Sequence, residues 1–242
     1  MRIIGWLLVV GAVGVVVPYT VLTVIFDYPD ILRQDAGVIL TRFHAGGARL
    51  IWVWWAFAIL GLPLLGAYVL LGQRLETAWR WARLATTLGV ISGIAQIIGL
   101  LRWTFVVPVL ARTYVTTAEP AARAAVTATF QAVHQFGGVV LGEHIGQLLT
   151  IAWTVMMAAA FAQVRLLPRW VSLLGYVAAA IYLLAQAELF ATVIPGFPVW
   201  DAAGLLGSTL WLVWLIVVGV GLLRVRVPDA PSPAASSVTP TR

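Results

Sequence analysis

The chain has 242 residues, of which 62% are hydrophobic and 10% are charged. A soluble domain is nearer half apolar and about a quarter charged, so this composition excludes an ordinary soluble domain and favours a membrane protein. All 15 basic residues are arginines, which give a net charge of +6, but they fall mostly between apolar runs and therefore indicate membrane topology rather than a nucleic-acid-binding patch.

Six apolar windows are long enough, at about 20 residues each, to cross the hydrocarbon core of a bilayer. They cover residues 3–26, 49–72, 84–110, 138–163, 170–193 and 203–224. Because these runs are continuously apolar rather than alternating, they predict helices and not barrel strands. The first run is much longer than the apolar core of a signal peptide, so we expect a retained helix. The predicted fold is all-α, a polytopic membrane bundle of about six transmembrane helices.

The arginines between the spans predict the orientation. Nine lie at the N-terminus, after the second and fourth spans and in the tail, whereas five lie on the other side. The positive-inside rule then places both termini in the cytoplasm, with the bundle in the plasma membrane. Residues 1–226 are predicted to form one transmembrane domain. A Pro/Ser/Ala-rich cytoplasmic tail, residues 227–242, is predicted to be disordered.

Two segments on the outer side are more than simple turns. Residues 27–47 place apolar side chains among charges, which predicts a short helix lying at the membrane interface. Residues 116–135 are rich in alanine and contain a helix start at Glu119-Pro120. This second segment is predicted to be either an N-terminal extension of the fourth helix or a lid across the outer mouth.

Four ionisable residues lie inside the predicted spans. Counted from the cytoplasmic arginine of each span, Arg102 and Glu188 lie 19 residues in, Glu143 lies 22 in and His144 lies 21 in. At about 1.5 Å per residue, all four lie roughly 28–33 Å from the inner face. Buried ionisable residues in membranes usually face the bundle interior and find partners. The sequence therefore predicts one polar layer in the outer part of the bilayer.

This layer supports three interpretations. In the first, Arg102, Glu143, His144, Gln147 and Glu188 bind or transport a small polar, anionic or lipid ligand, because the arginine fork suits a carboxylate or phosphate. In the second, Glu143 and His144 form the acid–base pair of a membrane-embedded enzyme. In the third, Arg102 pairs with Glu143 or Glu188 and only fixes helix packing in a structural or regulatory subunit.

Metal and cofactor sites are not predicted. The chain lacks cysteine, which excludes disulfides, thiolate nucleophiles and cysteine ligands. None of its three histidines, His44, His134 and His144, forms a spacing that aligns two imidazoles on one helical face. A metal site would require His44 or His134 to fold onto the layer of Glu143 and His144. The predicted partners are the lipid bilayer and a small-molecule or lipid ligand, with no nucleic acid.

Three strings in the chain resemble a bacterial family of integral membrane proteins catalogued as domain of unknown function 4386. They are "YPDILRQDAGVILTRFHAGG", "GLLRWTFVVPVLA" and "GEHIGQLLTIAWT". The positions that fit the family pattern are Arg102, Trp103, Pro108, Glu143, His144 and Gly146. The resemblance implies a multi-pass helical fold in the bacterial plasma membrane over nearly the whole chain before the tail. It implies no particular activity.

Overall fold

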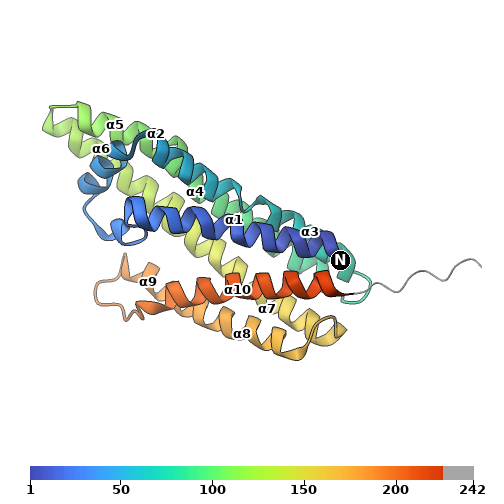
Figure 1. Ribbon diagram of the computed structural model, residues 1–242. Coiled ribbons are helices and arrows are strands. Elements are labelled where there is room, and N and C mark those ends of the chain that lie inside the picture. The colour runs from blue at the N-terminus through green and yellow to red at the C-terminus, as the bar shows by residue number, and fades with distance from the viewer. Residues whose placement is uncertain (226–242) are drawn as a thin grey trace, which may run out of the picture.

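A computed structural model describes residues 1–225, and all regular elements within them are helical (Figure 1). The elements are α1 (Arg2–Phe26), η1 (Asp30–Arg33), α2 (Ala36–Ile59), α3 (Leu62–Leu75), α4 (Ala82–Phe105), α5 (Val107–Thr116), α6 (Pro120–Val133), η2 (His134–Ile145), α7 (Gly146–Val164), α8 (Arg169–Leu184), α9 (Gln186–Ala191) and α10 (Ala202–Arg224). Here η1 is a 3-10 helix and η2 is a π-helix. The predicted disordered tail, residues 227–242, lies outside the described residues.

Six helical stretches are long and apolar enough to cross a membrane, which confirms the predicted all-α polytopic fold. They run over Arg2–Phe26, Ala36–Leu75, Ala82–Thr116, Pro120–Val164, Arg169–Ala191 and Ala202–Arg224. The second, third and fourth stretches contain 40, 35 and 45 residues. At about 1.5 Å per residue, each of these three exceeds a hydrocarbon core of about 30 Å, so they continue beyond the membrane.

The bundle has two different ends (Figure 1). The termini end carries Met1, the C-terminal end of α10, and the α3–α4 and α7–α8 connections. The loop end carries residues 27–35, the α5–α6 connection and residues 192–201. The extra helical length lies at the loop end, where α5, α6 and the first turns of α2 project.

Residues 27–47 contain the short η1 and the first part of α2, which begins at Ala36. A short helix is therefore present in this segment, and a kink at Gly47 separates it from the second span. The helix is interrupted at Gly47, whose φ of 57° lies in the left-handed region that glycine adopts without strain. Ile39 and Phe43 in this first part of α2 are buried against neighbouring elements. The Ala-rich segment forms a continuous extension of the fourth helix, which is the first of the two predicted alternatives.

The spans pack as a ring in chain order. The first span contacts the second through α2 and α3, and the contacts continue through α4, α7, α8 and α10 back to α1. The ring closes tightly at the termini end because α1 and α10 meet at two glycines. A Cβ atom on Gly5 would lie 2.6 Å from the carbonyl oxygen of Gly219. Small residues of this kind let membrane helices approach closely.

Two hydrophobic cores fill the ring. The first draws on α1, α3, α4, α7, α8 and α10, with Trp153 and Trp214 among its largest side chains. The second lies at the loop end and is rich in aromatic residues, including Phe26, Trp54 and Trp103. The rings of Trp54 and Trp103 stack with their centroids 4.7 Å apart. Among the described residues, this second core contains none from η2 to α10, so the loop ends of the last spans are not packed into it.

Candidate functional site

The fourth span contains a π-helix in its middle. His134–Ile145 forms 12 residues of π-helix between α6 and α7. Such helices are rare, usually last a single turn, and occur frequently at functional sites. Glycines at 137, 138 and 142 lie in this segment and bring it against α4. A Cβ atom on Gly99 would lie 2.7 Å from the Cα atom of Gly142 and 2.9 Å from the carbonyl oxygen of Gly137. The two backbones are therefore in direct contact.

Arg102, at the end of α4, is buried against this π-helix with 8% of its surface exposed. Its guanidinium donates to the carbonyl oxygen of Gly99, and its Nη2 lies 3.4 Å from Nδ1 of His134. A Cβ atom on Gly138 would overlap the guanidinium, so the glycine creates the space that Arg102 occupies. Because arginine can only donate, His134 accepts through Nδ1.

Arg102 does not form the ion pair that the structural interpretation expected. No carboxylate in residues 1–225 makes a salt bridge to it, and its Nε is buried without a hydrogen-bond partner. The guanidinium instead lies 5.3 Å from the ring centre of Trp103. Arg102 is thus a buried cation whose described contacts are a carbonyl oxygen, an imidazole and an aromatic ring.

Glu143 lies in the π-helix and is half-buried. Within the described part of the chain its carboxylate has neither a hydrogen bond nor a salt bridge, and no bond joins it to His144. Its charge nevertheless acts on Tyr28, which lies outside the spans: burial raises the pKa of the Tyr28 hydroxyl, and Glu143 raises that pKa further, whereas Arg102 lowers it. The charges of Glu143 and Arg102 are therefore both close enough to Tyr28 to affect the pKa of its hydroxyl.

His144 and Gln147 are joined by a glutamine from the fifth span. Gln186 donates from Nε2 to Oε1 of Gln147 at 2.6 Å. Its own Oε1 lies 2.9 Å from Nδ1 of His144, which therefore carries the proton and donates. Gln186 is buried, with 5% of its surface exposed. We call Arg102, His134, Glu143, His144, Gln147 and Gln186 the polar interior.

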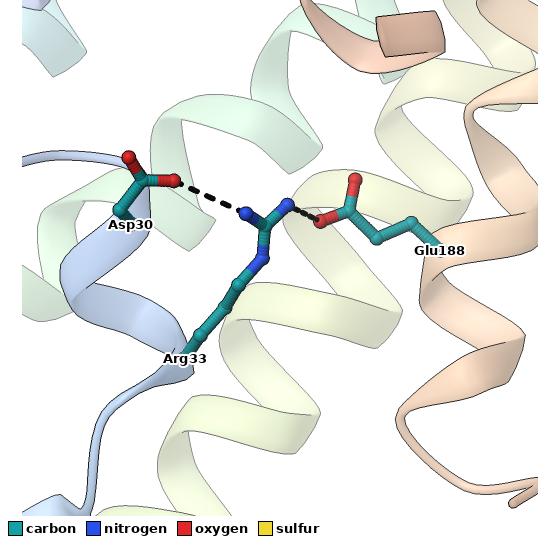
Figure 2. Close-up of polar contacts among 3 residues, drawn as sticks. All are labelled: Asp30, Arg33 and Glu188. Atoms are coloured by element: carbon teal, nitrogen blue, oxygen red, sulfur yellow. Dashed lines mark hydrogen bonds and ion pairs between the residues drawn. The ribbon is translucent and has the colours of Figure 1, made fainter. Parts of the chain in front are cut away.

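Glu188 is not part of the polar interior. It is half-buried at the loop end, where its Oε1 accepts from Nη2 of Arg33 at 2.6 Å (Figure 2). Nη1 of Arg33 contacts Asp30 at 3.1 Å. The hydrogen bond to Glu188 raises the pKa of Arg33. The predicted layer is therefore divided: Arg102, Glu143, His144 and Gln147 lie inside the bundle, and Glu188 pairs with a loop residue on its surface.

A second polar cluster was missed from the sequence. Ser92 and Gln96 of α4 meet Thr150 of α7: the Ser92 and Thr150 hydroxyl oxygens lie 2.6 Å apart, and Gln96 donates to both at 3.0 Å. Ser92 also donates to the carbonyl oxygen of Gly146 at 2.7 Å. The i,i+4 spacing of Ser92 and Gln96 was a usable signal, because such residues share a helix face. These groups satisfy one another and tie α4 to α7 beside the polar interior.

His134 was also missed as a neighbour of Arg102. Its ring stacks on Phe130 with the centroids 5.6 Å apart, which orients Nδ1 toward the guanidinium. His44, in contrast, is exposed on α2. In residues 1–225 no three His, Asp or Glu side chains gather as a metal site.

The family model described as domain of unknown function (DUF4386) matches residues 3–219. The chain belongs to this family. No curated protein and no solved structure matches the chain. The matched range contains the six apolar helical stretches, except Arg2 at the start of the first and the end of the last, and it contains the whole polar interior. The polar interior is thus built entirely from the DUF4386 domain.

Proposed function

We propose that this DUF4386 protein binds a small molecule or lipid, or transports it across the bacterial plasma membrane. In this proposal Arg102 holds the anionic group of the ligand. Both termini face the cytoplasm in this proposal, because nine arginines lie on their side and five on the other. The loop end then faces outward, and the ligand reaches the polar interior from the outside or from the outer leaflet.

The observation that carries the proposal is that the Arg102 guanidinium makes no salt bridge to any carboxylate in residues 1–225. A guanidinium inside a membrane bundle normally pairs with an acid or with several carbonyl groups, because an unpaired charge there is costly. Arg102 has one carbonyl, one imidazole nitrogen and an unused Nε. A carboxylate or phosphate would supply the missing anion, and the planar fork of arginine binds either group with two parallel hydrogen bonds.

A cleft at the loop end supports access from that side. It has a volume of about 530 Å³ and lies between α1, the segment around η1, and Leu205 of α10. Tyr28 lines this cleft and is also the residue on which the charges of Glu143 and Arg102 act. Its ring packs 5.1 Å from that of Trp54. Tyr28 therefore borders the cleft while its ring packs against the aromatic core at the loop end.

Anion-dependent stabilisation of the purified protein tests this proposal. We expect the thermal unfolding temperature to rise in the presence of at least one anionic probe, because a ligand that binds only the folded state stabilises it. The probes are inorganic phosphate, acetate, and short-chain phosphatidic acid in detergent, with the corresponding uncharged diacylglycerol as a blank. A response to phosphatidic acid alone identifies a lipid headgroup, and a response to phosphate or acetate identifies a soluble anion.

The matched variants are Arg102→Gln and Arg112→Gln. Arg112 is exposed on α5, so its loss controls for a general effect of removing one positive charge. The anion response should disappear in Arg102→Gln and persist in Arg112→Gln. An equal response in both variants, or no response of the native protein to any of the probes, would contradict the proposal.

A further inference from the structure

Helix α9 is the least firmly packed element around the polar interior. It is only six residues long, follows a one-residue interruption at Ala185 whose backbone angles remain right-handed helical, and packs mainly against α8 and η2. No residue of α9 belongs to either hydrophobic core. Since apolar packing is the main term that fixes a helix in place, α9 is held by other contacts.

Those other contacts are mostly polar, and they lie over the polar interior. Gln186 at the start of α9 bonds to both Gln147 and His144. The ring of Phe190 meets His144 edge-on, with the centroids 5.7 Å apart. Just after the helix, Thr192 accepts from Gln135 at 3.1 Å. All of these contacts are with the π-helix or with the first turn of α7, so α9 covers this part of the bundle.

One contact joins α9 to η1, the segment that follows the first span (Figure 2). The guanidinium of Arg33, on η1, lies between Asp30 of its own segment and Glu188 of α9. The segment carrying Arg33 is itself anchored, because Ile31 is 1% exposed and belongs to the loop-end core. The Arg33–Glu188 pair therefore connects an anchored segment to a helix that lies outside both cores.

The loop end has a weakly packed boundary between the last two spans and the rest of the bundle, which we call the seam. The loop-end core holds α1, η1, α2, α4, α5 and α6 together, and within residues 1–225 it includes nothing from the last two spans. Figure 1 shows α9 and the adjoining end of α10 set apart from α2, α5 and α6. The cleft that Tyr28 and Leu205 line opens along this seam.

We propose that α9 is a movable cover over the polar interior, and that the Arg33–Glu188 ion pair is the latch that holds it closed. The inference rests on the proposed function in one respect, namely that the covered site receives a ligand. Movement of α9 withdraws Gln186 from His144 and Gln147 and widens the seam toward the cleft. An exposed ion pair suits this role, because it is weak and is readily exchanged for water.

Cysteine labelling measures the opening directly, since the native chain contains no cysteine. The reporter is Glu143→Cys, a half-buried position on the π-helix that α9 contacts, and its side chain has no hydrogen bond in the described structure to lose. The purified protein in nanodiscs is treated with a polar maleimide, and the rate of labelling is followed. In the reporter variant with the Arg33–Glu188 pair intact, we expect slow labelling, because only the small fraction of molecules with α9 displaced can react.

Two substitutions in the reporter background form a matched pair. Glu188→Gln and Asp30→Asn each remove one carboxylate from Arg33, but only Glu188 lies on α9, whereas Asp30 belongs to the same segment as Arg33. We expect Glu188→Gln to raise the labelling rate about threefold, as suits loss of an exposed ion pair. Asp30→Asn should leave the rate nearly unchanged. Raising the salt concentration should mimic Glu188→Gln in the reporter alone and add little to it in the Glu188→Gln variant.

Equal rates in all three proteins, equal acceleration by both substitutions, or fast labelling of the latched protein would each overturn the latch. If the reporter fails to fold, hydrogen–deuterium exchange of the α9 amides in Glu188→Gln and Asp30→Asn answers the same question without it. Faster exchange in Glu188→Gln alone supports the latch, and identical exchange overturns it. Neither measurement uses an anion, so failure of the latch and failure of anion binding at Arg102 are told apart.

Discussion

Replacing Arg102 by methionine is expected to leave the free energy of unfolding within about 1 kcal/mol of the native value, or to increase it. The reason is that the guanidinium is buried and makes no salt bridge within residues 1–225, so no ion pair there offsets its desolvation. A hydrophobic side chain of similar length removes that cost. The measurement is unfolding of the purified protein in detergent, followed by tryptophan fluorescence, with the anion probes absent.

The same variant should lose all anion-dependent stabilisation, and this combination separates function from packing. A residue that only fixes helix packing would show the opposite pattern, namely a loss of more than about 3 kcal/mol on removal of one charged partner. Arg102→Lys adds a second comparison, because it keeps the charge but loses the planar fork. We expect it to lose most of the anion response as well. A lysine variant with a full response would contradict recognition by the fork.

The second large effect is expected at the contact between α4 and the π-helix. Gly99→Ala places a Cβ atom 2.7 Å from one backbone atom and 2.9 Å from another, and neither can rotate away as a side chain would. We expect a loss of about 3 kcal/mol in the free energy of unfolding, at the upper end of the usual cost of overpacking. The measurement is the same unfolding experiment.

Gly66→Ala in α3 is the matched control. There the added Cβ atom would lie 3.6 Å from Cδ1 of Leu7, which is ordinary van der Waals contact. Because alanine favours a helix over glycine by about 1 kcal/mol, this variant should be neutral or stabilised. Two identical substitutions would thus have opposite signs. If Gly99→Ala were as well tolerated as Gly66→Ala, the close approach of α4 and the π-helix would be disproved.

The sequence was sufficient to predict the six spans and their helical nature. Continuous apolar runs are a direct consequence of a lipid environment, in which every backbone group is satisfied within its own helix. The ends of the helices were less predictable. The second helix begins at Ala36, before its apolar window at 49, because Ile39 and Phe43 pack into the bundle even though Arg42 lies between them.

The π-helix was beyond sequence reasoning. Gly137, Gly138 and Gly142 show that close packing is allowed, but the change in helical register depends on the neighbouring backbone at Gly99 and on the guanidinium of Arg102. Both of these lie on another span. A local pattern carries no information about such a partner until the spans are assembled.

Counting residues from the membrane face gives an expected depth for each polar side chain but does not identify its partners. Depth follows from the rise per residue, whereas partners depend on how each helix is rotated about its axis. His144 consequently bonds to Gln186, and Arg102 contacts His134. Glu188 bonds to Arg33 of η1. Arg33 lies between two spans, so a depth counted along a span does not apply to it.

Anion binding at Arg102 is tested most directly by a high-resolution density map of the protein purified from its native membrane and kept in lipid nanodiscs. If Arg102 binds an anion, the map will show non-protein density with the shape of a carboxylate or phosphate group within hydrogen-bonding distance of its guanidinium. A map in which Arg102 instead forms a salt bridge to Glu143, with no other density beside it, would contradict anion binding and leave these residues with a structural role.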